Sequence, residues 1–281
     1  MKIRFDINGQ SFEGDSADAI SIAIPMDFEG PQPSHFGAPR AVSATYEANG
    51  FVGDTNRGGS CNVNSLTMVP HCNGTHTESV GHIVNQDVYI GHSTADSLMT
   101  ATLVTVEPEL WKDVKQSDQP EDYRPPLDPQ DWVITAAQLK SVFSELSRST
   151  PIERTTALVI RTIGSIPKKS AAYGDALPPP FLTVQAMELL ISRGYRHLLV
   201  DFPSVDRMYD DGLLTNHHLY WGVVEGSHEL GVDSRQDKTI SEMVLVPDEV
   251  EDGLYLLNLQ VPALCTDAAP SRPVIFRTRK I

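Results

Sequence analysis

The sequence predicts a mixed α/β fold, and three observations support this expectation. Two segments, at about residues 135–148 and 183–193, have the apolar periodicity of amphipathic helices. Runs rich in β-branched residues, typical of buried strands, lie beside these helices. The order strand, helix, strand between residues 156 and 201 predicts a βαβ unit. No good linker divides the chain, so we expect a single mixed α/β domain over residues 1–281.

The first third of the chain is predicted to hold strands separated by loops. Asn8-Gly9 in "MKIRFDINGQSFEG" is typical of a hairpin turn, and "AISIAIPM" (19–26) has the composition of a buried strand. Glycines and prolines between residues 30 and 60 favour loops. Two further strand candidates are "VNSLTMV" (63–69) and "SLMTATLVTV" (97–106).

Both helices carry start or stop signals. Thr135 can cap the first helix, with Gln138 at the capping-box position. The second helix begins at about Thr183 and is expected to end at Gly194. The remaining strand candidates are residues 156–163, 196–201, 241–247, 254–261 and 273–278.

Composition and charge limit the classes of function. The chain has 281 residues and a formal net charge of −15, which disfavours nucleic acid and anionic membrane as partners. No apolar run approaches the roughly 20 residues of a membrane span, and the N-terminal segment lacks the apolar core of a secretory signal. Three cysteines do not form a disulfide framework, so we expect a cytoplasmic protein.

The segment "HCNGTHTESVGHI" (71–83) concentrates side chains that bind metals. It holds three histidines, one cysteine and one glutamate. In an extended chain Cys72, His76 and Glu78 would point to the same side, with His82 farther along. A single histidine is more often a structural residue, but this concentration favours a metal site. Imidazole, thiolate and carboxylate together suit zinc, and imidazole with carboxylate also suits manganese.

The same segment resembles the signature of the cyclase-type metal-dependent hydrolases, the family of bacterial kynurenine formamidase and isatin hydrolase. The family pattern is H-x-G-T-H-x-D-x-P-x-H. It is matched here at Gly74, Thr75, His76 and His82. The chain departs from it at Cys72, Glu78 and Val80, which replace histidine, aspartate and proline.

The resemblance extends along the chain, over about residues 19–265. "LLVDFPSVD" (198–206) resembles the family's D-x-P-S-V-D segment, and we interpret its two aspartates as structural or supporting residues. "NHHLYWG" (216–222) and "ISEMVL" (240–245) resemble the histidine and glutamate segments that complete the metal site.

The resemblance implies a swivelling β/β/α-type fold, a homodimer or homotetramer, and a set of site residues. The implied ligands are His76 and Glu78, joined by Cys72 or His71 and by the distant His217 and Glu242. The register from Gly74-Thr75-His76 favours Cys72, but ligand chemistry does not exclude His71. His218 is the alternative to His217, because 25 positions separate His217 from Glu242, against about a dozen in the family.

The implied activity is hydrolysis of a carbon–nitrogen bond in a small-molecule formamide or cyclic amide. Zinc or manganese would activate a water as the nucleophile, and His82 would be the acid–base residue. Tyr220, Trp221 and Phe36 are candidates for contact with the substrate. Two alternatives are a lactone hydrolase or dehydratase that uses the same site, and a non-catalytic metal- or small-molecule-binding protein on this scaffold.

Overall fold

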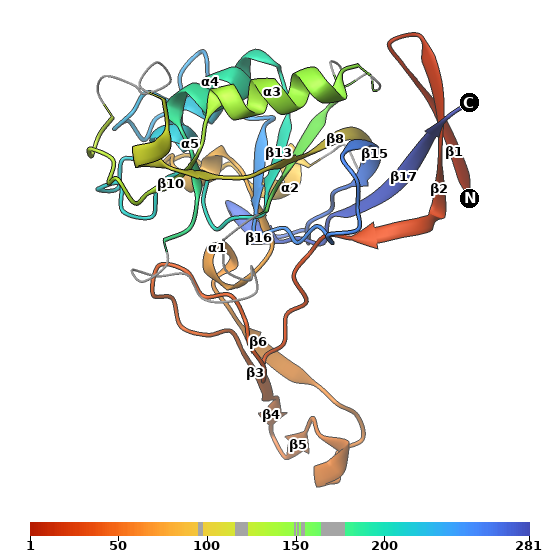
Figure 1. The fold of residues 1–281 in the computed structure, drawn as a ribbon. Helices are drawn as coiled ribbons and strands as arrows, with labels where there is room; N and C mark the ends of the chain where they lie inside the picture. Colours follow the sequence, from red (N-terminus) through yellow and green to blue (C-terminus); the bar gives the residue numbers. More distant parts are fainter. Residues whose placement is uncertain (95–97, 116–122, 149, 151, 153–154, 164–177) are drawn as a thin grey trace.

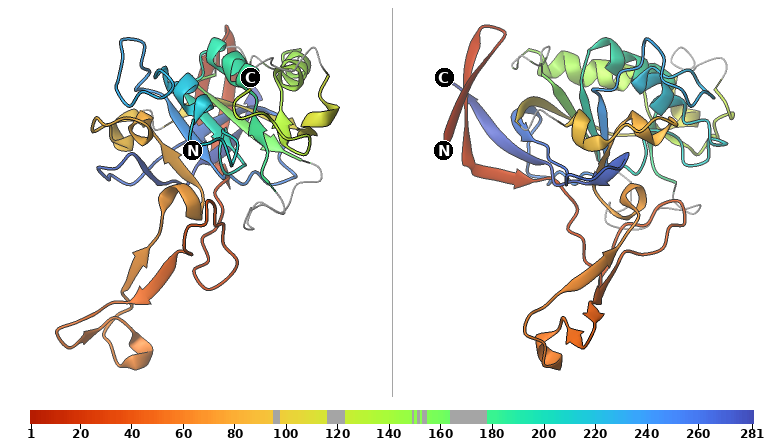
Figure 2. Two further views of the ribbon diagram at one scale, coloured as in Figure 1. Left: turned by 90° about the vertical axis from the view of Figure 1, so that its left-hand side faces the viewer. Right: turned by 180° about the vertical axis from the view of Figure 1, so that it is seen from behind.

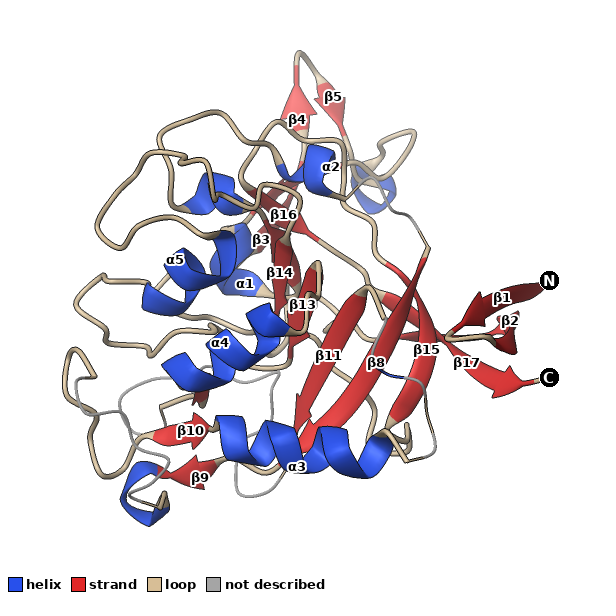
Figure 3. Cartoon of the chain, turned by 90° about the horizontal axis from the view of Figure 1, so that it is seen from above, coloured by secondary structure: helices blue, strands red, loops and turns tan. Residues whose placement is uncertain are grey.

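The computed structural model describes residues 1–94, 98–115, 123–148, 150, 152, 155–163 and 178–281. Among these residues, ten strands form one mixed sheet (Figures 1 and 3). In sheet order the strands are β1 (Lys2–Ile7), β2 (Gln10–Ser21), β17 (Val274–Lys280), β15 (Gly253–Asn258), β8 (Met99–Val106), β11 (Ala157–Thr162), β13 (His197–Val200), β14 (Thr239–Glu242), β7 (His76–Glu78) and β16 (Ala268–Pro270).

The centre of the sheet is parallel and both of its sides are antiparallel. Strands β8, β11, β13 and β14 pair in parallel. β15 joins them antiparallel on one side, and β7 and β16 do so on the other. The strand–helix–strand unit predicted for residues 156–201 is confirmed as β11, α4 (Val184–Ser192) and β13. The mixed α/β fold class is therefore confirmed.

Helices cover one face of the sheet. In Figures 1 and 3, α3 (Ala136–Leu146), α4 and α5 (Thr215–Trp221) lie along that face. Side chains alternate between the faces of a strand, so Leu158 and Ile160 of β11 belong to the core under the helices. Ala157 and Val159 belong to the core on the opposite face.

The opposite face is closed by the curvature of the sheet itself. The end of β2 returns to β14, where Ala23 forms an antiparallel bridge with Val244 and the Leu245 amide donates to the Ile22 carbonyl (2.8 Å). Ile22 and Ile275 pack there with the inward side chains of β8 and β15. The core of this face therefore lies between strands far apart in the sequence.

A narrow β-ribbon extends away from the body of the molecule (Figures 1 and 2). Its antiparallel strands are β3 (Val42–Thr45) and β6 (Asn64–Thr67), and β4 (Glu47–Ala48) and β5 (Phe51–Val52) pair beyond them. We call residues 42–67 the arm. Loops were expected over residues 30–60, so β3, β4 and β5 correct that expectation, whereas β6 confirms the strand predicted at 63–69. β3 was not predicted because it has no buried apolar side chain, and it forms through backbone pairing with β6.

The smaller elements complete the fold. They are β9 (Glu109–Leu110), β10 (Trp132–Ile134), β12 (Phe181–Leu182), α1 (Pro70–Asn73), α2 (Ile90–Ser93) and the 3₁₀ turns η1 (Thr55–Arg57), η2 (Val80–His82) and η3 (Trp111–Asp113). Within the described part of the chain, every helix is too short or too polar to cross a membrane.

Several local predictions are confirmed. Asn8 and Gly9 have φ values of 51° and 71°, as the hairpin turn requires. Thr135 and Gln138 form the predicted capping box of α3, and Thr183 caps α4. The strand expected at 241–247 is shifted, because β14 ends at Glu242 and Met243 has a φ of 55°.

Candidate metal centre

Two adjacent strands form the floor of the candidate site. β7 pairs antiparallel with β14, and this pairing places His76 directly opposite Glu242. Their side chains share one face, so His76 Nε2 lies 3.4 Å from Glu242 Oε2. Glu78 is two residues beyond His76 and points to the same side. All three side chains are at most 5% exposed.

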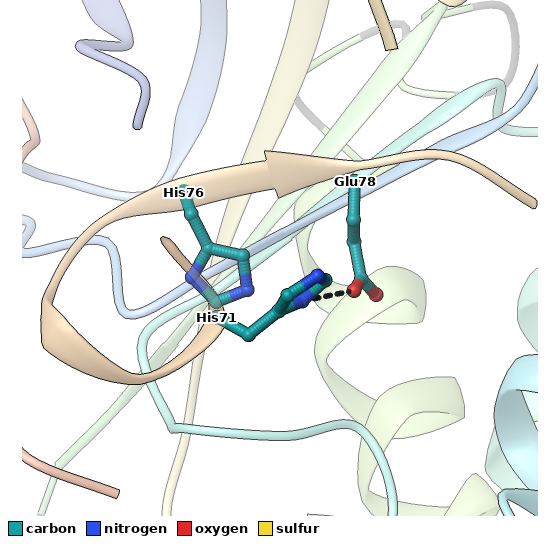
Figure 4. Close-up of side chains that lie close together, drawn as sticks. All are labelled: His71, His76 and Glu78. Atoms are coloured by element: carbon teal, nitrogen blue, oxygen red, sulfur yellow. Dashed lines mark ion pairs between the residues drawn. The ribbon is translucent and has the colours of Figure 1, made fainter. Parts of the chain in front are cut away.

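His71 approaches this floor from α1. Its Nδ1 atom lies 3.0 Å from Glu78 Oε2, and its ring is 5.2 Å from that of His76, centroid to centroid (Figure 4). The extended face expected from Cys72 to Glu78 begins only at His76, because residues 70–73 form a helical turn. This turn directs the His71 side chain toward Glu78.

His217 reaches the same carboxylate from the helix side of the sheet. It lies on α5, and its Nε2 is 2.9 Å from Glu78 Oε1 and 3.8 Å from Glu242 Oε1. Its Nδ1 is 2.6 Å from Asp206 Oδ2. Asp206 therefore supports His217 directly, in agreement with its expected supporting role.

Asp206 also explains helix α5, which was not predicted. Its carboxylate accepts hydrogen bonds from the backbone N–H groups of Asn216 (2.7 Å) and His217 (3.2 Å) at the N-terminal end of the helix. Gly222, with a φ of 68°, ends the helix. A helix that depends on a cap nine residues before its first turn lacks the local signal used to predict helices.

His82 lies at the outer edge of the cluster. It is on the turn η2, where the Ser79 side chain accepts a hydrogen bond from the Gly81 amide (3.3 Å). His82 Nε2 is 3.9 Å from Glu78 Oε2, and its ring stacks on His71 with centroids 4.2 Å apart. The side chain is 28% exposed, so it adjoins both the cluster and solvent.

The charges of the cluster stabilise one another. Burial alone would raise the pKa of Glu78, but His82, His217 and His71 together hold it well below its usual range. Burial would lower the pKa of His217, but Glu78 and Asp206 raise it well above its usual value. These buried groups therefore form a network of ion pairs.

The histidine nitrogens are arranged as metal ligands require. His76 Nδ1 lies 3.0 Å from the Gly74 carbonyl, which can only accept, so this nitrogen carries the proton. His217 Nδ1 is held by Asp206 in the same way. The Nε2 atoms of both rings then point into the cluster, where His217 Nε2 pairs with Glu78 Oε1 and His76 Nε2 is buried without a hydrogen-bond partner. Such outer anchoring is the usual support for histidine ligands, so these residues fit a divalent metal ion.

Glu242 is also held in place. Its Oε1 atom accepts a hydrogen bond from the Val205 amide (2.8 Å), which leaves Oε2 toward His76. Three overlapping groups of described residues could each hold an ion: His71, His76 and Glu78; Glu78, His82 and His217; and His71, His82 and Asp267.

Cys72 and His218, the alternative ligands, lie outside these three groups. Cys72 is buried, and burial, followed by the charge of Glu242, raises the pKa of its thiol. His218 is buried on α5, and burial lowers its pKa. His71 and His217 are the members of each pair that contact Glu78.

The candidate substrate residues lie in different environments. Tyr220 and Trp221 are fully buried in the core under the helices, where Tyr220 Oη donates to the Arg196 carbonyl (3.1 Å) and Trp221 Nε1 to the Lys238 carbonyl (3.0 Å). Phe36 is 54% exposed, beside His35, whose amide donates to the Cys72 carbonyl. A substrate contact for these three residues stays a prediction.

Asp267 is a residue of the cluster that the sequence analysis missed. Its Oδ2 atom is 2.8 Å from His71 Nε2 and 3.5 Å from His82 Nδ1. It precedes β16, whose Ala268 pairs with Glu78. Because 196 positions separate Asp267 from His71, only the pairing of β16 with β7 brings them together. No spacing rule in the sequence indicates that pairing.

Comparison with protein families gives one match. A family model described as a putative cyclase matches residues 19–207. That range includes the histidine cluster and the aspartate segment that ends at Asp206. No curated protein matches the chain.

Solved structures with the same fold are distant in sequence. A predicted metal-dependent hydrolase from Bacillus stearothermophilus is 16% identical with a TM-score of 0.55, and the match covers 92% of this chain and 97% of that one. Isatin hydrolase A from Labrenzia aggregata, bound to benzyl benzoate, is 14% identical with a TM-score of 0.56, covering 93% and 94%. A novel cyclase is 10% identical with a TM-score of 0.58, covering 94% and 90%. The similarity at this level is one of fold.

Proposed function

This chain belongs to the putative cyclase family, and from that membership and the site geometry we propose that it is a metal-dependent hydrolase. Its substrate is a small molecule with a carbon–nitrogen bond at a carbonyl, either a formamide or a cyclic amide. The isatin hydrolases among the structures of similar fold support this substrate class. The metal is zinc or manganese, since both suit imidazole and carboxylate ligands.

The inward-facing donor set is the observation that carries the proposal. His76 and His217 are anchored at Nδ1 by a carbonyl and a carboxylate, so both present Nε2 to Glu78 and Glu242. A buried imidazole nitrogen without a hydrogen-bond partner is costly unless a ligand satisfies it. We assign His71 as the third histidine, because its Nδ1 faces Glu78, and keep Cys72 as the alternative.

The bound ion would polarise the substrate carbonyl and lower the pKa of a water molecule. The protein itself supplies orientation and proton transfer. His82 is partly exposed and presents Nε2 toward Glu78, so it can take a proton at that atom and return it to the leaving nitrogen. Glu78 and Glu242 would hold the ion and compensate its charge.

Elemental analysis of the purified protein tests the metal site. The wild type should contain near-stoichiometric zinc or manganese, and Glu78→Ala should remove it. His71→Ala and Cys72→Ala form the decisive pair: loss of metal in the first variant alone supports His71 as the ligand. Loss in the Cys72 variant alone would move the assignment to Cys72. A wild type that takes up no metal after reconstitution would refute the proposed function.

An activity screen tests the chemistry. Formamides, cyclic amides and lactones should be offered to the metal-loaded protein and to His82→Ala. We expect turnover of an amide, with the rate reduced by about 10²–10⁴-fold in the variant while its metal content is unchanged. Turnover of lactones alone would replace the amide assignment. Substrate binding without turnover would indicate a binding protein on this scaffold.

A further inference from the structure

Two imidazoles span the same pair of carboxylates at the open edge of the cluster. His71 places Nε2 on Asp267 and Nδ1 on Glu78. His82 stacks on His71 with the two ring nitrogens exchanged, so that its Nδ1 faces Asp267 and its Nε2 faces Glu78. The two rings thus have the same outer contact, the Oδ2 atom of Asp267.

The chemistry of this outer contact determines which nitrogen carries the proton. A carboxylate can only accept hydrogen bonds, so each ring must direct an N–H group toward Asp267. Glu78 is also a carboxylate, so without a metal ion the opposite nitrogen of His71 carries a proton as well. An ion bound at Glu78 would replace that proton and leave the N–H group toward Asp267 in place. The nitrogen toward Glu78 is Nδ1 in His71 and Nε2 in His82.

The backbone around Asp267 fixes its position relative to both histidines. The Asp267 carbonyl accepts hydrogen bonds from the Ser79 amide (2.9 Å) and the Ser79 hydroxyl (3.1 Å). Ser79 is the N-cap of η2, the turn that carries His82. Ala268 continues into β16, which pairs with β7. With its backbone held at these points, Asp267 keeps its carboxylate beside both rings and can orient them without being a ligand itself.

We propose that Asp267 is a positioning residue that holds His71 as the Nε2–H tautomer and His82 as the Nδ1–H tautomer. His71 Nδ1 is thereby presented to the metal and His82 Nε2 to the substrate. This inference rests on the metal site proposed above. Asp267 would then anchor the ring of His71, as the Gly74 carbonyl anchors His76 and Asp206 anchors His217.

The first test measures zinc affinity by competition with a chromophoric chelator. Asp267→Asn keeps the shape of the side chain but offers an N–H group to the imidazoles, and Asp267→Ala removes the contact. Both should weaken zinc binding by about 10–100-fold, the usual effect of losing such a partner. Asp87→Asn, on an exposed loop of the same region, is the control and should bind zinc like the wild type.

A double variant separates action through His71 from a general structural effect. If Asp267 acts through His71, Asp267→Asn should cause no further loss of zinc affinity in the His71→Ala background. Equal losses in both backgrounds would overturn the proposal. A wild-type zinc affinity in Asp267→Asn would also overturn it, while leaving the proposed metal site intact.

The second test observes the tautomers without any activity assay. Long-range ¹H–¹⁵N correlation spectra of the zinc-loaded protein should show a protonated Nε2 for His71 and a protonated Nδ1 for His82. Asp267→Ala should mix the tautomers of His82, and a His71 protonated at Nδ1 in the wild type would refute the inference. Absence of zinc binding by the wild type would instead refute the proposed function.

Discussion

Substitution of Asp206 by asparagine should weaken both the fold and the metal site. The Asp206 carboxylate accepts three hydrogen bonds: from the backbone N–H of Asn216 at 2.7 Å, the backbone N–H of His217 at 3.2 Å and His217 Nδ1 at 2.6 Å. It is 4% exposed, so water does not replace lost partners. The asparagine oxygen can occupy only one of the two carboxylate positions, and the amide group cannot accept a hydrogen bond at the other.

The magnitude follows from these contacts. A hydrogen bond to a charged group contributes about 1.5–3 kcal/mol. Loss of one or two of them predicts that Asp206→Asn lowers the free energy of unfolding by about 3 kcal/mol. At roughly 2–4 °C per kcal/mol for a chain of this size, Tm should fall by about 6–12 °C. Metal affinity should fall by about 10–100-fold, because His217 loses its outer anchor.

Urea and thermal denaturation of the metal-free protein give the stability change, and chelator competition gives the affinity. Asp237→Asn is the matched control, because Asp237 pairs with Arg196 at 3.1 Å but is 60% exposed. Because this ion pair is exposed, Asp237→Asn should change the free energy of unfolding by no more than about 0.5 kcal/mol. If Asp206→Asn changes stability no more than the control and retains full metal affinity, the assigned role of Asp206 is wrong.

Three further predictions concern groups outside the cluster. Lys2 and Arg279 lower the pKa of Glu13 to about 2 from its ordinary 4.5, so Glu13→Gln should be less stable than the wild type above pH 4.5. Urea denaturation should show this difference in stability fading as the pH falls from 4.5 toward 2. Burial, and to a smaller extent the charge of Arg235, lowers the pKa of Lys238 to about 8 from 10.5, so the unfolded state binds more protons between these pH values. The stability of the wild type relative to Lys238→Met should therefore rise from pH 8 to 10.5. Trp221→Phe should cost about 2 kcal/mol in urea denaturation, because it leaves a cavity and removes the donor to the Lys238 carbonyl; an unchanged midpoint would contradict this.

Local signals in the sequence predicted local structure well. The hairpin at Asn8-Gly9, the capping box of Thr135 and Gln138, and the common face of His76 and Glu78 each depend on residues at most three positions apart. Their geometry follows from backbone preferences and from the period of a helix or strand. The structure has all of these features.

Contacts between distant segments could not be predicted in the same way. Asp267 reaches His71 only because β16 pairs with β7, and Asp206 caps α5 only because the chain returns to that position. The direction of His71 and Cys72 depends on whether residues 70–73 are extended or helical. Pro70 at the first helical position is a signal for the helical choice, but one turn of helix has too few hydrogen bonds to be predicted from propensity.

The arm has a consequence for how the molecule opens to solvent. Its ladder pairs Val42 with Thr67 and Thr45 with Asn64, and exposed side chains such as Leu66 (58%) bury little apolar surface on it. A two-stranded ribbon of this kind is marginally stable in water. Its amide hydrogens should therefore exchange with deuterium in local opening events that leave the central strands protected. Exchange would divide the chain into a rapidly opening ribbon and a slowly opening sheet, and the candidate metal centre belongs to the slow part.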